Sequence, residues 1–346
     1  MSTEGEKTAP AGWLEERLGW PRMLASLAAR RVPRNGISHY FGGITLFLLV
    51  LQVSSGILLM LYYQPDAAQA HASVERIVAE LPYGKLIRAT HVWASDLFVG
   101  FLLAHLFAIV LRRSYRSPRE LGWLSGIACL FLGIGLAFTG ALLPWSLNAQ
   151  TDARVGSDLA RYVPIVGEQL RRFMRGGEDV NASTLGHAFG FHVAALPAAL
   201  TLVIGVHLFF LSRRQPTPHD PNDPKLIPLY PDFFVRGAAL TVAVLLAVMS
   251  LVVFIERPLG PAADLTSSAP GAYPPWYFLP VHQIVSMAPK ELLGMDGARF
   301  LVGAACALGL VVVALPFLDR RGSKYTAWAA VAFLVVLLAL SSRAVH

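Results

Sequence analysis

Two apolar stretches that begin and end on histidine decide the fold: HVWASDLFVGFLLAH, residues 91–105, and HVAALPAALTLVIGVH, residues 192–207. At about 1.5 Å per residue, the two histidines of each stretch lie roughly 21–22 Å apart along a helix axis. Four helical turns take ~14.4 residues, so both histidines of a stretch face the same way, one near each side of a membrane. Histidine is costly in lipid and generally faces a partner or a cofactor.

The composition around these stretches is that of a membrane protein. The 346 residues are 55% hydrophobic and 15% charged, whereas a soluble domain carries about 25% charged residues. Seven apolar runs are each close to the roughly 20 residues that a membrane-spanning helix needs; they cover 41–63, 88–111, 122–144, 188–211, 237–255, 300–317 and 325–340. Because helices satisfy their own backbone hydrogen bonds in lipid, we expect an all-α integral membrane protein with seven transmembrane helices. These features exclude a soluble enzyme, a disordered chain and a nucleic-acid-binding domain.

The distribution of basic residues sets the orientation. Of the 29 lysines and arginines, 17 lie in the N-terminal segment and in the second, fourth and sixth connections between the runs. The positive-inside rule therefore places the N-terminus in the cytoplasm. Residues 13–31 are amphipathic and suited to the membrane interface. The predicted units are an interfacial segment 1–36, a domain 37–215 with four spans and a domain 216–346 with three.

The connections predicted on the outer side are long and contain structure. Residues 157–176, between the third and fourth runs, have apolar residues at helical spacing and predict short helices. The connection 258–297 is rich in proline and glycine but also in aromatic residues. A connection of this length is usually functional or disordered, and its aromatic content argues against disorder.

The four histidines supply two imidazoles at each of two depths. This arrangement fits bis-imidazole ligation of two haem irons, with His91 and His192 on one and His105 and His207 on the other. Zinc would need a cluster of four nitrogen, sulfur or oxygen ligands, and the spacing provides no such cluster. The alternative is four buried histidines that donate hydrogen bonds to backbone carbonyls.

Glycines repeat with the period of the histidines. Gly42 and Gly56 in the first run, and Gly126 and Gly140 in the third, are also 14 residues apart. A flat macrocycle within a bundle of the first four helices needs close approach of the backbones, which glycine permits. We therefore expect a four-helix bundle that encloses two stacked haems; the alternative for either glycine pair is ordinary small-residue helix packing.

Several motifs resemble the cytochrome b/b6 family, the dihaem subunit of quinol–cytochrome c and plastoquinol–plastocyanin oxidoreductases. The resemblance covers about residues 11–340, and its second part is similar to the three-helix companion subunit of the b6 form. The matching motifs are WLEERL (13–18), FGGITL (41–46), LIRATHVW (86–93), PREL (118–121), TGALLPW (139–145), VPIVG (163–167), YPDFF (230–234) and PPWYFLP (274–280).

The resemblance implies a subunit of a bc-type quinol–cytochrome c oxidoreductase with two non-covalent b haems. It implies that quinol is oxidised at an outer site between the third and fifth connections. One electron would pass to a Rieske iron–sulfur protein, and the other would cross the haems to an inner quinone site in a Q cycle that builds a proton gradient. It further implies a c-type cytochrome subunit, a homodimer and membrane lipid as partners. The expected location is a prokaryotic inner membrane, and an organelle membrane is the alternative. No covalent haem is expected, because Tyr40 and Phe41 occupy the place before Gly42 where the b6 form carries cysteine.

The outer-site motif departs from the family. The family usually reads PEWY, whose glutamate is thought to take a quinol proton, whereas Pro275 stands in that place beside Trp276 and Tyr277. Proline cannot accept a proton. His282 lies seven residues later, where relatives usually carry Tyr or Phe, and an imidazole suits proton transfer near neutral pH. We hypothesise that His282 accepts that proton; the alternative is a hydrogen-bonding residue in the wall of the site.

Charged residues near the predicted haems show further differences. Arg88 matches a family arginine near the outer haem. The arginine expected three residues after His105 is Ala108, and Arg112 and Arg113 either contact the haem carboxylates in its place or act as a basic anchor in the cytoplasm. Asp96 lies in the apolar run, so it belongs either to a proton path or to an interior hydrogen bond.

Two other functions remain open at this point. The missing glutamate is compatible with a dihaem electron conduit that serves another oxidoreductase without splitting the two electrons of quinol. Buried histidine and aspartate are also compatible with a proton-coupled transporter, which would bind no haem. The quinone type, the haem potentials and the final electron acceptor do not follow from the sequence.

Overall fold

The computed structural model describes residues 25–26, 28–33, 36–213, 226–264, 274–320 and 323–343. Most of the predicted interfacial segment 13–31 lies outside this part of the chain. Within it, six helical stretches are long and apolar enough to cross a membrane. They are α3 (Phe41–Met60), α5 (Gly84–Leu111), α6 (Glu120–Leu142), the continuous stretch Ala182–Ser212, the stretch Leu229–Phe254 and Tyr325–Ser342, the apolar part of α15 (Lys324–Arg343).

The sixth apolar run, 300–317, forms a shorter helix. α13 (Gly297–Val313) has 17 residues, and α14 (Leu315–Leu318) follows it after a break. Pro316 lies in the first turn of α14, where proline is tolerated, whereas within a helix it would remove a backbone hydrogen bond. The run 300–317 therefore does not continue as one straight helix, and α13 is slightly short of the length that spans a bilayer.

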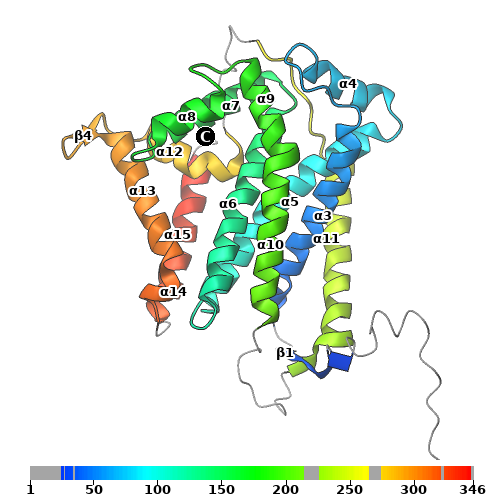
Figure 1. Ribbon diagram of the computed structural model, residues 1–346, viewed down its shortest axis with the longest axis vertical. Helices are drawn as coiled ribbons and strands as arrows, with labels where there is room; N and C mark the ends of the chain where they lie inside the picture. Colours follow the sequence, from blue (N-terminus) through cyan, green and yellow to red (C-terminus); the bar gives the residue numbers. More distant parts are fainter. Residues whose placement is uncertain are drawn as a thin grey trace, which may run out of the picture.

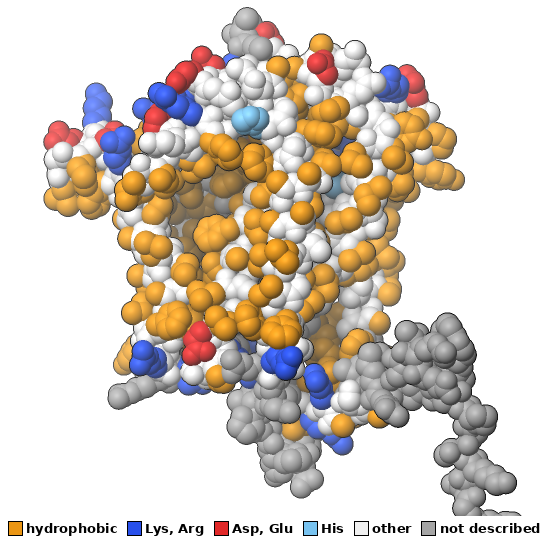
Figure 2. Space-filling model, in the orientation of Figure 1, with side chains coloured by type: hydrophobic (Ala, Val, Ile, Leu, Met, Phe, Trp, Pro, Cys, Tyr) orange, Lys and Arg blue, Asp and Glu red, His pale blue; other side chains and the backbone are white. Residues whose placement is uncertain are grey.

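The side chains are sorted as a membrane requires. Hydrophobic side chains cover the middle of the molecule, and most of the charged ones lie at its two ends (Figure 2). Many large apolar residues on α3, α10, α11 and α15 are exposed, as expected for helix faces that contact lipid. The chain is therefore an integral membrane protein.

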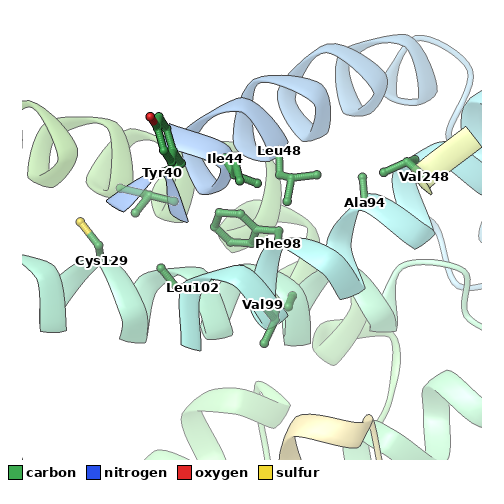
Figure 3. Packing of buried hydrophobic residues seen from close by; sticks show 11 residues of the cluster. Tyr40, Ile44, Leu48, Ala94, Phe98, Val99, Leu102, Cys129 and Val248 are labelled. Atoms are coloured by element: carbon green, nitrogen blue, oxygen red, sulfur yellow. The ribbon is translucent and has the colours of Figure 1, made fainter. Parts of the chain in front are cut away.

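The helices pack most closely within the pairs α3–α5 and α6–α10 (Leu196–Ser212). One buried cluster joins α3, α5, α6 and α11 (Phe234–Phe254), with Phe98 of α5 beside Leu48 and Ile44 of α3 (Figure 3). Val248 of α11 lies in the same cluster and is fully buried. This packing holds α3 and α5, which carry two of the predicted glycines and two of the predicted histidines, in one register.

A π-helical segment accounts for the unequal spacing of the histidines. The fourth span consists of α9 (Ala182–Gly190), η2 (Phe191–Ala195) and α10. Residues 191–195 are π-helical, and the N–H of Leu196 donates to the carbonyl of Phe191, five residues back. A π-bulge accommodates one extra residue in a helix. The 15-residue spacing of His192 and His207 therefore matches the 14-residue spacing of His91 and His105 in α5.

Short helices cover the end of the spans at which α5 begins (Figure 1). They are α4 (Ala70–Glu80), α7 (Leu147–Ala160), α8 (Gly167–Arg175), η4 (Trp276–Phe278) and α12 (Leu279–Ser286). The sequence predicted helix from residue 157, but α7 begins ten residues earlier, because the Ser146 side chain accepts a hydrogen bond from the N–H of Ala149. Such a cap satisfies an otherwise unpaired donor at a helix start.

Two small sheets and two short helices complete the described elements. β1 (Arg31–Pro33) pairs with β2 (Leu226–Pro228) at the other end of the molecule, and β3 (Glu291–Leu292) pairs with β4 (Met295–Asp296). η1 (Ile37–His39) precedes α3, and η3 (Leu229–Phe233) precedes α11.

The C-terminal helices leave a recess beside the main group of helices. Trp123 of α6 donates to the carbonyl of Val312 at 3.1 Å, and the Tyr115 hydroxyl donates to Asp319 at 2.6 Å. These bonds hold α13 and α14 against α6 at one end. Toward the other end, beneath α8 and α12, a recess with hydrophobic side chains opens between α6 and the C-terminal helices (Figures 1 and 2).

Candidate functional site

His91 of α5 and His192 of η2 face each other. Their ring centres are 6.2 Å apart and the ring planes are nearly perpendicular, at 82°. A metal ion between two imidazole nitrogens, at about 2.0–2.1 Å from each, would place the ring centres about 6.4 Å apart. The spacing of this pair therefore fits one metal ion held between the two rings.

The hydrogen bonds of His91 fix its tautomer. The Ser55 hydroxyl donates its proton to the Leu51 carbonyl at 2.7 Å, and it lies 2.9 Å from Nδ1 of His91. Because the hydroxyl proton is already donated, Nδ1–H of His91 donates to the Ser55 oxygen. The lone pair of Nε2 is then available to a metal, the arrangement usual for a ligating histidine.

The same logic applies to His207 and His192. Ser125 donates to the Leu121 carbonyl at 2.8 Å and lies 2.9 Å from Nδ1 of His207. Nδ1 of His192 lies 3.0 Å from the Leu136 carbonyl, which can only accept. Nε2 therefore has a free lone pair in both rings.

His105 and His207 form the second pair, near enough for their ring charges to interact. The buried Nδ1 of His105 has no hydrogen-bond partner among the described residues. Within that same part of the chain, no group of three or more His, Cys, Asp or Glu side chains is placed to hold a metal ion. Each pair of histidines would thus offer two nitrogen ligands to a metal ion, as haem iron would require.

Each predicted glycine lies against one of these histidines. A Cβ added at Gly140 would lie 2.5 Å from Cε1 of His192, and a Cβ at Gly42 would lie 3.0 Å from Cε1 of His105. At Gly56 and Gly126 the nearest atoms are Cε1 of His91 and Cε1 of His207, both at 3.2 Å. Any side chain at these four positions would press on the predicted ligands.

The segment before η4 is tied to α5 one turn beyond His91. Arg257 donates to Asp96 at 2.5 Å, and its guanidinium lies 3.9 Å from the centre of the Trp93 ring. Trp276 donates from Nε1 to Asp96 at 3.1 Å. Asp96 thus joins the helix that carries His91 to the aromatic segment. Its partners are an arginine that follows α11 and the first residue of η4, and these bonds are partly exposed.

The third and fifth connections are joined directly. The N–H of Leu147 donates to the Pro261 carbonyl at 2.9 Å, and the N–H of Ala263 donates to the Trp145 carbonyl at 3.0 Å. These bonds set the start of α7 beside the segment that leads to η4.

Three titratable groups belong to this region. Burial, and then the charges of Asp96 and Asp152, raise the pKa of Tyr277 above its usual value. Burial lowers the pKa of His282 on α12. Burial also raises the pKa of Asp152 on α7 to about 7. Pro275 precedes Trp276 as the residue before η4 and offers no titratable group.

Comparison with known proteins identifies the family. A family model described as cytochrome b/b6/petB matches residues 29–215, and one described as cytochrome b(C-terminal)/b6/petD matches residues 262–345. The chain belongs to the cytochrome b/b6 family. A cytochrome bc complex cytochrome b subunit of Chlorobaculum thiosulfatiphilum is 34% identical over 334 residues, which cover 93% of this chain and 76% of that protein.

Other cytochrome b relatives are subunits of oxidoreductase complexes. The cytochrome b subunit of the menaquinol:cytochrome c reductase of Bacillus subtilis is 36% identical over 212 residues, covering 59% of this chain and 94% of that protein. A solved structure titled hyperthermophilic respiratory Complex III superposes with a TM-score of 0.84 at 25% identity, covering 96% of this chain and 91% of that one. This family implies b-type haem, and the facing pair of His91 and His192 fits it.

The arginines that the sequence analysis placed near the predicted haems lie at opposite ends of α5. Arg88 donates to the Arg257 carbonyl at 2.8 Å and so belongs to the network around Asp96. Arg112 donates to the Ser38 hydroxyl and lies near enough to His105 for their charges to interact. Arg113 follows it in a left-handed backbone conformation, with φ of 54°.

Sequence reasoning missed the hydroxyl groups that orient the histidines. Ser55, Ser125 and Thr139 each directly precede one of the four glycines, and each lies within 3.4 Å of Nδ1 of a histidine. Phe41 precedes the fourth glycine, Gly42, which faces the histidine whose Nδ1 has no partner in the described chain. A search for Ser-Gly and Thr-Gly pairs with the histidine period would have found them.

Proposed function

We propose that this chain is the dihaem cytochrome b subunit of a bc-type quinol–cytochrome c oxidoreductase. The observation that carries the proposal is the set of four imidazoles, each ring against a glycine. His91 and His192 face each other at 6.2 Å, and His105 and His207 lie near enough for their charges to interact. In this proposal His91 and His192 hold an outer haem, and His105 and His207 hold an inner one. The first four spans form the four-helix bundle around both, with Gly42, Gly56, Gly126 and Gly140 beside the ligands. α13 with α14 provides the sixth of the seven spans.

Two non-covalent b haems would supply a route for single electrons across the membrane. The chain holds and orients them: Ser55, Ser125 and the Leu136 carbonyl accept from the Nδ1–H groups and direct Nε2 inward. Arg88 near the outer pair and Arg112 and Arg113 near the inner pair are the cations proposed to face the haem carboxylates.

Quinol oxidation is proposed to take place on the outer side, where α7 meets η4 and α12. Pro275, Trp276 and Tyr277 with His282 would line the site beside the hydrophobic recess (Figure 2). A Rieske iron–sulfur protein would take one electron and deliver it to a c-type cytochrome subunit. The other electron would reach an inner quinone site, so that a Q cycle contributes to the proton gradient. The name of the Bacillus relative makes menaquinol the first quinol to test.

The proposed setting is a prokaryotic inner membrane with the N-terminus in the cytoplasm. The basic residues support this orientation through the positive-inside rule. A homodimer is proposed from the family resemblance, and the exposed apolar faces of α10, α11 and α15 are available to lipid or to a second copy.

His282 is proposed to accept one quinol proton in place of the family glutamate. Its lowered pKa keeps the ring neutral, and so able to accept a proton, at neutral pH. Replacing His282 by phenylalanine should lower quinol oxidation at least about tenfold, since general bases contribute about 100- to 10,000-fold. Turnover per haem in membranes measures this effect. His39→Phe, at the opposite end of the spans, is the control; wild-type turnover in His282→Phe would end the idea.

Inhibition at the outer site tests the proposed function as a whole. Quinol-dependent reduction of cytochrome c by the purified complex is expected to stop when an outer-site inhibitor is added. A dihaem conduit without quinol bifurcation, with which Pro275 is also compatible, would be insensitive to the same inhibitor. A proton-coupled transporter would show no haem absorbance at all.

A further inference from the structure

Oxidation of a quinol at the proposed outer site requires bases for two protons. Near Tyr277 the described chain offers two carboxylates, since the charges of Asp96 and Asp152 both act on its phenol. Asp96 is already engaged, because it accepts from Arg257 at 2.5 Å and from Trp276 at 3.1 Å. Asp96 could take up a proton only if these bonds to a guanidinium and an indole were weakened.

Asp152 is in a different situation. It lies half-buried on α7. Among the described residues it makes no hydrogen bond and no ion pair. Asp158 on the same helix, by contrast, pairs with Arg175 at 2.8 Å. The next residue, Ala153, is buried in the same cluster as Phe278, the neighbour of Tyr277. α7 packs against α12, and α12 borders the recess (Figures 1 and 2).

The charged groups around Asp152 leave it free to change protonation. α12 contributes His282. α8 contributes Arg175, which pairs with Asp158, and Arg171 and Arg172, which pair with Glu168 and Glu178. On its own helix, Arg154 and Arg161 follow Asp152, and burial is the cause of its shifted pKa. The only Asp, Glu, Lys, Arg or His of α6, the third helix packed on α7, is Glu120, at the far end of that helix. No cation among these groups holds Asp152 ionised, which agrees with the raised pKa of its carboxyl.

We infer that Asp152 is a further catalytic residue of the outer site, the carboxylate that accepts the second quinol proton. The inference rests on the proposed function. Quinol becomes quinone as both O–H bonds break and two electrons leave, one to the iron–sulfur partner and one to the outer haem. One proton goes to the His282 ring, and the other forms an O–H bond on the Asp152 carboxylate. Both are then released to the outer aqueous phase.

The test is the pH profile of Asp152→Asn in the whole complex. In the wild type, kcat/KM should rise with pH and level off above about 7, because a base must be deprotonated before it accepts a proton. In Asp152→Asn this rise of kcat/KM with pH (the pH limb) should disappear, and turnover per haem should fall at least about tenfold. Asp152→Glu should retain the limb, and Asp158→Asn, on the same helix, should keep it as well.

The outcomes separate this inference from the proposed function. If the wild-type complex does not oxidise quinol in an inhibitor-sensitive way, the proposed function fails and the role of Asp152 with it. If the wild type does so, and Asp152→Asn has both wild-type turnover and the wild-type pH limb, only the inference about Asp152 is overturned. Loss of haem from both Asp152→Asn and Asp152→Glu would make the residue structural and would also overturn it.

Discussion

Replacing His192 by alanine is expected to remove about one haem per chain and to lower quinol-dependent cytochrome c reduction at least about a hundredfold. The ring faces His91 at 6.2 Å and is the partner ligand of the proposed outer haem. Without that haem the electron from the outer site has no route to the inner one, and a hundredfold loss corresponds to about 2.7 kcal/mol in the barrier. Haem content per chain and turnover measure the two effects.

His187 provides a matched control on the same span. It lies five residues before His192, on α9, and its Nδ1 is 3.0 Å from the Phe173 carbonyl instead of facing α5. His187→Ala is expected to retain both haems. Full haem content in His192→Ala, or loss of a haem from His187→Ala, would contradict the assignment of the ligands.

Gly140→Ala is expected to have the second largest effect. The new Cβ would lie 2.5 Å from Cε1 of His192, whereas ordinary contacts begin at 3.4 Å, so the ring must move by about 0.9 Å. Overpacking of this kind costs about 1–3 kcal/mol, which corresponds to a loss of about 5- to 150-fold in affinity for the outer haem. Haem retention on dilution and the reduced-minus-oxidised spectrum report the change.

Gly205→Ala separates crowding of the ligand from a general effect of alanine. Gly205 lies on α10, between His192 and His207, and nothing lies within 4 Å of a Cβ added there. Alanine is the better helix former by about 1 kcal/mol, so this variant should keep both haems and gain slightly in stability. Equal haem loss from both variants would show that contact with His192 is not the cause.

The sequence predicted the relation between histidines and glycines because both follow helical periodicity. Spacings of 14 and 15 residues place side chains on one helix face, whatever the tertiary packing. The spacing could not show that His192 lies in a π-helical segment, since such a segment depends on one shifted backbone hydrogen bond. It also could not show which helix each glycine faces. The structure places Gly42 and Gly56 against α5, and Gly126 and Gly140 against the fourth span.

Sequence patterns do not reveal interactions between residues that are far apart in the chain. Asp96 was recognised as an acid that needed a partner, but Arg257 is 161 residues away in the chain and Trp276 is 180. From the sequence, only His282 was proposed as the proton acceptor that replaces the missing glutamate at Pro275. Asp152 was not recognised, because no periodicity relates it to Tyr277. The shortness of α13 was also missed, since an apolar run does not reveal that Pro316 begins a separate turn.

The number of haems on the purified chain is the most direct measurement. Two b haems per chain are expected, with a reduced-minus-oxidised α-band that disappears when His91, His105, His192 and His207 are all replaced by alanine. A colourless protein, or a pigment that survives those four replacements, would contradict the central claim.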